Sequence, residues 1–236
     1  MKVSIIIPIR DEEFVVTKTV NELADKLKGF PCEIIFINDF SVDNTTKVIQ
    51  EIIKTKPNIT LYQNKRRGLG GAITEGINKS TGEAICIMMS DLSDSIDDLK
   101  KYCKIIEEEN VDAVFGSRFI KNSKIINYPK KKLILNRIFN LITKLLFFSN
   151  YNDFTNAFKI YKKSALIKTF PLVSESFNIF LEMPLKIISR KMKYKITPIS
   201  WTNRKDGSSK FNIKELWAKY FFTLIYCLLE KLLLKK

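Results

Sequence analysis

The sequence predicts an α/β fold in which a mostly parallel, Rossmann-like sheet is flanked by helices. Short apolar runs alternate with helical patterns through the first 118 residues, which is typical of parallel strands joined by crossover helices. The 236 residues are enough for one sizeable core, and no repeat, low-complexity tract or linker-like stretch divides them. We therefore expect a single domain over residues 1–236.

Five apolar runs bounded by polar residues are the expected buried strands. Helical patterns follow the first four of them, at residues 11–28, 41–54, 66–79 and 96–109. Parallel strands end at the same edge of a sheet, and open α/β sheets bind their ligands at the carboxyl edge. The expected strands are Val3–Pro8, Glu33–Asp39, Ile59–Gln63, Ala84–Met89 and Ala113–Arg118.

Two of these strands lead into carboxylates. Asp39 ends the second strand, and Asp91 follows the fourth in the stretch Ala84–Asp94. Asp94 could instead cap a helix that begins near Ser95. The glycines from Gly68 to Gly71 do not form GxGxxG and are a weak signal alone. Combined with the two acids, they indicate a site for a nucleotide and a divalent cation, because Mg²⁺ prefers oxygen ligands.

Three further helices are expected, at Leu133–Phe148, Ser176–Arg190 and Ile213–Leu234. The first and the third are apolar except for one narrow polar stripe. The apolar run at 216–229 would span roughly 21 Å, which is short of a hydrocarbon core of about 30 Å. We expect both helices to lie in a membrane interface with lysines on anionic headgroups; packing in the core or in a dimer interface is the alternative. The stripes comprise Asn136, Arg137, Asn140, Thr143 and Lys144, and Glu215, Lys219, Thr223 and Glu230.

The composition limits the partners and the catalytic groups that this protein can use. A formal charge of +15 indicates an anionic partner, for which nucleic acid, phosphorylated small molecules and anionic lipid all qualify. Histidine is absent from the sequence, which excludes His-based triads and His metal sites. The four cysteines form no CxxC pair and are expected to be reduced core residues, and the first residues lack a signal-peptide pattern. Both observations favour a cytosolic compartment.

Six motifs occur in a characteristic order: PIRDE at 8–12, NDFSVDNT at 38–45, RGLG at 67–70, SDLS at 90–93, GSR at 116–118 and DFTNAF at 153–158. This order resembles glycosyltransferase family 2, specifically the dolichyl-phosphate mannose synthase-like polyprenyl-phosphate glycosyltransferases with a GT-A fold. The resemblance runs from Val3 to Lys210. It implies a nucleotide-sugar-binding half at 1–125, an acceptor-binding half at 126–210 and an amphipathic membrane-interface helix at 211–236.

The resemblance also implies roles for individual residues. The donor nucleotide sugar would be bound by Pro8, Glu12, Asp39, Gly68, Asp91, Arg204 and Lys210. The acceptor phosphate would be bound by Arg118, Lys132, Asn136 and Arg137. Asp91 is the second acid of a DxD-type metal motif, but Met89 stands in place of the first, so Ser93, Asp94 or the nucleotide and water would complete the cation shell.

Two further departures from the family pattern stand out. The family's Arg-x-x-x-Ser acceptor motif appears as Lys132 and Asn136, which keeps a cation but loses the bidentate guanidinium fork. Phe40 stands where glycine is common in the family. Tyr128, Trp201 and Trp217 are expected to be core or interfacial anchors.

The expected function is inverting transfer of a hexosyl group from GDP-mannose or a UDP-sugar to a dolichyl or undecaprenyl phosphate, with Mg²⁺ or Mn²⁺. A lipid phosphate is largely ionised at neutral pH, so no general base is required. We expect a peripheral enzyme on the cytoplasmic face of a membrane, with a membrane-anchoring partner or as a homodimer, and without nucleic acid. The alternatives are a family 2 enzyme that acts on a glycan hydroxyl, with Glu182 or Asp153 as base, and a non-catalytic nucleotide-binding or nucleic-acid-binding module.

Overall fold

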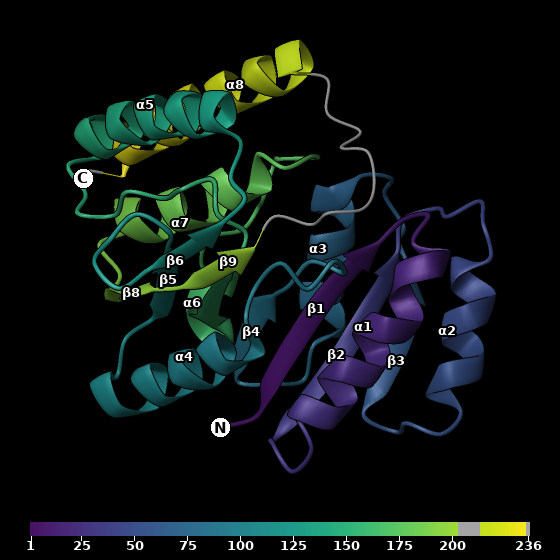
Figure 1. Ribbon diagram of the computed structural model, residues 1–236. Helices are drawn as coiled ribbons and strands as arrows, with labels where there is room; N and C mark the ends of the chain where they lie inside the picture. Colours follow the sequence, from purple (N-terminus) through teal and green to yellow (C-terminus); the bar gives the residue numbers. More distant parts are fainter. Residues whose placement is uncertain (203–212, 235–236) are drawn as a thin grey trace.

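A computed structural model describes residues 1–202 and 213–234 (Figure 1). Its seven-stranded sheet has the order β3-β2-β1-β4-β7-β5-β8. The five strands predicted from the sequence are confirmed as β1 (Val3–Ile9), β2 (Cys32–Asn38), β3 (Ile59–Gln63), β4 (Ala84–Ile87) and β5 (Ala113–Ser117). The predicted α/β fold with a mostly parallel sheet is therefore confirmed.

The second half of the chain completes the sheet in a way that the sequence did not predict. β7 (Lys159–Lys162) lies between β4 and β5 and runs antiparallel to both. β8 (Tyr194–Pro198) pairs parallel with β5 at the edge of the sheet. A separate two-stranded sheet joins β6 (Lys124–Ile126) to β9 (Ser200–Thr202). The antiparallel β7 brings the DFTNAF motif next to the carboxyl end of β4.

Helices cover both faces of the sheet and enclose two apolar clusters. On one face lie α1 (Glu13–Lys26), α2 (Thr45–Ile53) and α4 (Ile96–Glu109). On the other lie α3 (Leu69–Lys79), α6 (Lys163–Ile167) and α7 (Ile179–Ser189). The four cysteines are buried and unpaired, as predicted.

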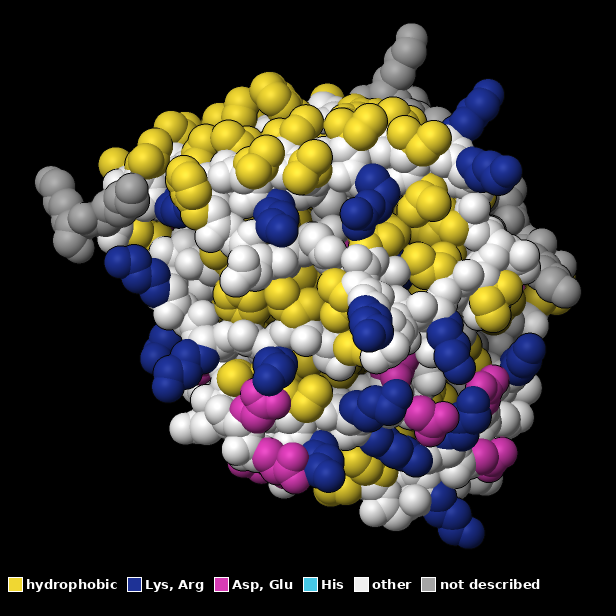
Figure 2. Space-filling view, turned by 60° about the vertical axis from the view of Figure 1, so that its left-hand side comes forward, with side chains coloured by type: hydrophobic (Ala, Val, Ile, Leu, Met, Phe, Trp, Pro, Cys, Tyr) yellow, Lys and Arg dark blue, Asp and Glu magenta, His cyan; other side chains and the backbone are white. Residues whose placement is uncertain are grey.

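The remaining helices, α5 (Lys130–Phe147) and α8 (Ile213–Leu233), lie side by side as an outer layer over α7 (Figure 1). Part of each polar stripe faces the protein, since Asn140, Thr143 and Thr223 are buried, whereas Arg137 is exposed. Many of their other apolar side chains point outward and form a surface, the apolar cap (Figure 2). Among the described residues, no helix has both the length and the apolar composition needed to cross a membrane. The cap comprises Ile134, Leu135, Ile138, Leu141, Ile142, Leu145, Leu146, Phe148, Trp217, Phe221, Phe222, Ile225, Leu229, Leu232 and Leu233.

Candidate active site

Asp39 organises the glycine turn at the carboxyl edge of the sheet. Its Oδ1 accepts hydrogen bonds from the backbone N–H of Gly68 at 2.8 Å and from Nδ2 of Asn64 at 2.7 Å. Gly68 has a φ of +112°, a conformation that L side chains rarely adopt, and it precedes the first turn of α3. The buried carboxylate therefore fixes the turn that presents the N-terminus of α3.

The other predicted nucleotide-binding residues of the first half lie at the same edge. Pro8 is near the end of β1, in register with Ile37 of β2. Glu12 precedes α1, and its backbone N–H donates to Oγ1 of Thr45 at 2.8 Å. Phe40 has a φ of +57°, in the left-handed region, which accounts for the family's preference for glycine at this position.

The segment after β4 forms a tight acidic turn. Oδ1 of Asp91 accepts the backbone N–H of Ser93 at 3.1 Å, and Leu92 between them has a φ of +50°. Asp94 is only 6% exposed, and its Oδ1 has no hydrogen-bond partner. Burial, together with the charge of Asp91, raises the pKa of Asp94 to about 7. The N-cap of α4 is Ser95, so the alternative reading of Asp94 as a helix cap is wrong.

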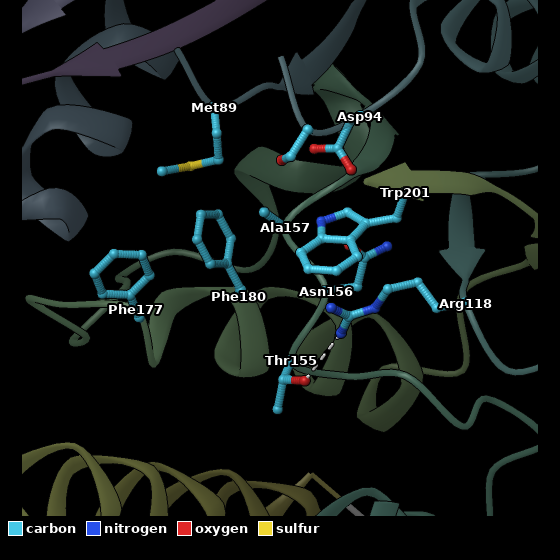
Figure 3. A pocket seen from close by; sticks show the side chains of 10 residues that line it. Met89, Asp94, Arg118, Thr155, Asn156, Ala157, Phe177, Phe180 and Trp201 are labelled. Carbon is cyan, nitrogen blue, oxygen red and sulfur yellow. Dashed lines mark hydrogen bonds between the residues drawn. The ribbon is translucent and has the colours of Figure 1, made fainter. Parts of the chain in front are cut away.

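A cavity of about 120 Å³ separates this turn from the second half of the chain (Figure 3). Enclosing pockets for small molecules typically measure about 300–1,000 Å³, so the cavity can take only one end of a larger ligand. Met89, Ser93 and Asp94 line one side of it. The rest of the lining comes from Arg118, Thr155, Asn156, Ala157, Phe177, Phe180 and Trp201.

Arg118 is the cation of this cavity. It follows β5 and is held by Asp153 through hydrogen bonds from Nε at 2.8 Å and from Nη2 at 2.6 Å. Its guanidinium carbon also lies 5.4–5.5 Å from the ring centres of Phe119, Tyr128 and Trp201. Burial alone would lower the pKa of Arg118, but the charge of Asp153 outweighs it and raises that pKa. The guanidinium is therefore a fixed and permanent positive charge.

The structure brings together part of the predicted acceptor site. Oγ1 of Thr155 accepts Nδ2 of Asn136 at 2.7 Å and Nη2 of Arg118 at 3.4 Å, which links α5 to the cavity. The guanidinium carbon of Arg137 lies 4.6 Å from the ring centre of Phe119. Lys132 lies exposed in the first turn of α5. Arg204 and Lys210 lie outside the described residues.

Sequence reasoning gave no role to Thr155 or Lys159, and it considered Asp153 only as a base. The DFTNAF motif was a visible signal for Asp153 and Thr155. Lys159 carried no such signal, because a lysine in a short strand usually points to solvent. Its buried Nζ donates to the carbonyl oxygens of Phe154, Asn156 and Phe180, and burial lowers the pKa of Lys159 to about 7. Lys159 thus ties the motif to the start of α7.

Residues 4–170 match the family model described as glycosyl transferase family 2. A dolichol-phosphate mannosyltransferase of Pyrococcus furiosus is 24% identical over 219 residues, which is 92% of this chain and 61% of that protein. A dolichyl-phosphate beta-glucosyltransferase, ALG5A, of Trichomonas vaginalis is 28% identical over 219 residues, with 87% and 67% covered. The chain thus spans less than two thirds of the Pyrococcus relative.

Solved structures share the fold at lower identity. Glucosyl-3-phosphoglycerate synthase from Mycobacterium tuberculosis, in complex with Mn²⁺, UDP and phosphoglyceric acid, has a TM-score of 0.69 at 14% identity. That match covers 96% of this chain and 78% of the synthase. TarS 1–349 of S. aureus in complex with UDP-GlcNAc has a TM-score of 0.62 at 19% identity, with 94% and 65% covered.

Proposed function

Because this chain belongs to glycosyltransferase family 2 and has the GT-A fold, we propose that it transfers a hexosyl group from a nucleotide diphosphate sugar to a polyprenyl phosphate, with inversion. The observation that carries the proposal is the cavity in which the acidic turn faces the fixed cation Arg118. A donor held at the acidic turn would present its anomeric carbon to an anionic acceptor held by Arg118. The names of the two curated relatives support a polyprenyl phosphate as this acceptor.

The donor would lie along the carboxyl edge from β1 to β4. Pro8, Glu12 and Asp39 would contact the nucleoside. The turn at Gly68 would bind the diphosphate, since backbone N–H groups at a helix N-terminus bind phosphate. Arg204 and Lys210 stay part of this proposal as residues that would close over the diphosphate. The complexes of TarS with UDP-GlcNAc and of the synthase with UDP support a nucleotide sugar as the donor.

A divalent cation, Mg²⁺ or Mn²⁺, fits the acidic turn. Asp91 offers a carboxylate, and the unpartnered Oδ1 of Asp94 and the hydroxyl of Ser93 add oxygen ligands. The described residues contain no group of three His, Cys, Asp or Glu that could hold a metal ion, so the nucleotide and water would supply the other ligands. When bound, the cation would stabilise the charge that develops on the leaving diphosphate.

The acceptor phosphate would bind at the edge of the Arg118 guanidinium that faces away from Asp153. Asn136, Arg137 and Lys132 on α5 would contribute further polar contacts between this phosphate and the apolar cap. The role of the protein is to place an already ionised phosphate oxygen in line with the anomeric carbon and to keep water out. No general base is needed.

The apolar cap would rest on the membrane that carries the acceptor. Residues 119–152 contain no Asp or Glu but hold Lys121, Lys124, Lys130, Lys131, Lys132, Arg137 and Lys144. Cations beside an outward apolar surface match anionic headgroups above a hydrocarbon layer. Figure 2 shows Lys and Arg side chains bordering the cap. A prenyl chain in this layer would be adjacent to α5 and so to the cavity.

The glycan-hydroxyl alternative needs a general base, and the two candidate carboxylates are engaged elsewhere. Asp153 is fully buried in its pair with Arg118. Glu182 is equally buried, pairs with Lys186 at 3.1 Å and accepts the backbone N–H groups of Val173 and Ser174. These contacts give Glu182 a structural role inside the protein.

A transfer assay tests the proposal. Labelled GDP-mannose, UDP-glucose and UDP-N-acetylglucosamine are each incubated with polyprenyl phosphates of several lengths, with and without Mg²⁺ or Mn²⁺. We expect one donor to give a metal-dependent lipid-linked product, which Asp91→Asn should abolish. Asp25→Asn, at an exposed position on α1, is the matched control. Arg118→Lys should lower kcat/KM for the acceptor about 100-fold, because the planar fork is lost.

Two outcomes would overturn the proposal. Sugar transfer to glycan hydroxyls but not to lipid phosphate would establish the alternative family 2 activity. Binding of RNA or DNA that weakens across a salt series, without any transfer, would point to a nucleic-acid-binding module.

A further inference from the structure

Two residues of α8, Thr223 and Tyr220, hold the segment 172–178, here called the covering segment. Oγ1 of Thr223 accepts Nδ2 of Asn178 at 2.8 Å and lies 3.4 Å from Oγ of Ser174. Nδ2 of Asn178 also donates to Oγ of Ser174 at 3.0 Å. One turn earlier on α8, the hydroxyl of Tyr220 donates to the carbonyl oxygen of Phe177 at 3.0 Å. Residues from α8 therefore fix both the side chains and the backbone of the covering segment.

The covering segment in turn lies against the glycine turn. The backbone N–H of Gly70 donates to the carbonyl oxygen of Glu175 at 3.1 Å. A Cβ at Gly70 would be 1.8 Å from the carbonyl oxygen of Ser174, and one at Gly68 would be 2.6 Å from that of Glu175. The two backbones are so close that a shift of the covering segment must change the turn.

A second set of contacts connects the same parts. The carboxylate of Glu182 on α7 accepts the backbone N–H groups of Val173 and Ser174. Lys186 pairs with Glu182 at 3.1 Å and with Glu230 of α8 at 3.5 Å. Glu182 and Lys186 are almost fully buried, so their positions depend on one another.

We propose that α8 is a positioning element of the donor site and that Thr223 is its main positioning residue. Thr223 holds the covering segment against the glycine turn, so that seating of α8 and binding of the nucleotide stabilise each other. The coupling is reciprocal, as it must be for two linked binding equilibria. This inference rests on the proposed function, because it takes the glycine turn to bind the donor diphosphate.

Calorimetric titration with UDP and with GDP, each with Mg²⁺, tests the inference on the purified full chain. Thr223→Val removes the hydroxyl but keeps the shape, and should raise the Kd of the bound nucleotide about tenfold. Thr223→Ser restores the hydroxyl and should stay within about twofold of wild type. The matched control is Thr143→Val, because Thr143 on α5 is equally buried but its hydroxyl bonds to Phe139 of its own helix. It should leave the Kd unchanged.

The outcomes separate this inference from the proposed function. A wild-type protein that binds neither nucleotide overturns the proposed function, and the inference with it. If the wild type binds a nucleotide and Thr223→Val binds it with the same Kd, only the proposed role of α8 is overturned. If Thr223→Val does not fold, hydrogen exchange of the wild type decides. The nucleotide should then slow exchange in residues 217–230 as well as 66–71, and protection confined to 66–71 would overturn the inference.

Discussion

Arg118 and Asp153 form a buried, bidentate ion pair beneath the cavity, with side chains 7% and 0% exposed. The carboxylate also accepts the backbone N–H of Arg118 at 2.9 Å. Asp153 therefore fixes the backbone and the guanidinium of Arg118 together. The guanidinium would otherwise be a buried charge without a counterion.

Asp153→Asn should lower the free energy of unfolding by about 3–5 kcal/mol, because it leaves that charge unpaired in the interior. Urea denaturation followed by circular dichroism measures the difference. Glu109→Gln is the control, since Glu109 pairs with Lys195 at 2.8 Å but both side chains are exposed, and it should cost less than about 1 kcal/mol. Equal losses of unfolding free energy in the two variants would mean that the buried pair stabilises the protein no more than an exposed pair does.

Glu33 should make stability depend on acid pH. Burial alone would raise its pKa, but hydrogen bonds from Oγ of Ser4 and from N and Oγ1 of Thr81 outweigh burial and lower the pKa to about 2. A carboxylate with a lowered folded-state pKa stabilises the protein above pH 4.5, and this contribution is lost as the pH falls toward 2.

Glu33→Gln should therefore cost about 1–2 kcal/mol at pH 7, a value reduced from the full linkage because the group is partly solvated. The difference from wild type should narrow between pH 5 and pH 3 in denaturation series. Glu108→Gln, at an exposed i,i+4 pair with Lys104, should show no such trend. If the difference in unfolding free energy between wild type and Glu33→Gln stays constant with pH, titration of Glu33 is not its source.

The sequence predicted the parts of this protein that local patterns determine. Apolar runs marked β1 to β5, and their polar ends placed Asp39 and Asp91 at one edge. It did not predict β7, because an antiparallel insertion depends on pairing with β4 and β5 rather than on the four residues of β7 themselves. Lys159 was missed for the same reason, since only the tertiary fold surrounds its ammonium with carbonyl oxygens.

The direction in which α5 and α8 face was also beyond local patterns. A narrow polar stripe can meet water or a polar interior, and periodicity does not distinguish the two. Here Asn140 donates to the carbonyl oxygen of Asn136 and accepts the backbone N–H of Phe154, so the stripe of α5 is satisfied inside the protein. The apolar faces are therefore left outside.

The apolar cap should bind lipid. Phe221 and Phe222 are 61% and 63% exposed. Replacing both with serine should lower the partition coefficient on phosphatidylcholine vesicles that contain phosphatidylglycerol by at least about tenfold. The reason is that each Phe buried in the lipid contributes about 1.5–3 kcal/mol. Cosedimentation with the vesicles measures the partition coefficient. Ile167→Ser, at a similarly exposed apolar position on α6, should leave partitioning unchanged. Loss of self-association without any change in vesicle binding would instead identify the cap as a dimer interface.

Substitution of Gly70 tests whether nucleotide binding depends on the close packing of the glycine turn against the covering segment. Gly70→Ala would place a Cβ 1.8 Å from the carbonyl oxygen of Ser174, and this backbone atom can move only if the covering segment moves. We expect a loss of about 3 kcal/mol in unfolding free energy, in the range of severe overpacking, together with a loss of UDP or GDP binding. Gly29→Ala is the control: its Cβ would meet nothing within 4 Å, but its φ of +76° should cost about 1 kcal/mol. Both variants should therefore melt earlier than wild type, whereas only Gly70→Ala should lose the nucleotide in calorimetric titration. Unchanged nucleotide affinity in Gly70→Ala would mean that the turn does not contact the diphosphate, because a displaced turn could not otherwise leave its ligand undisturbed.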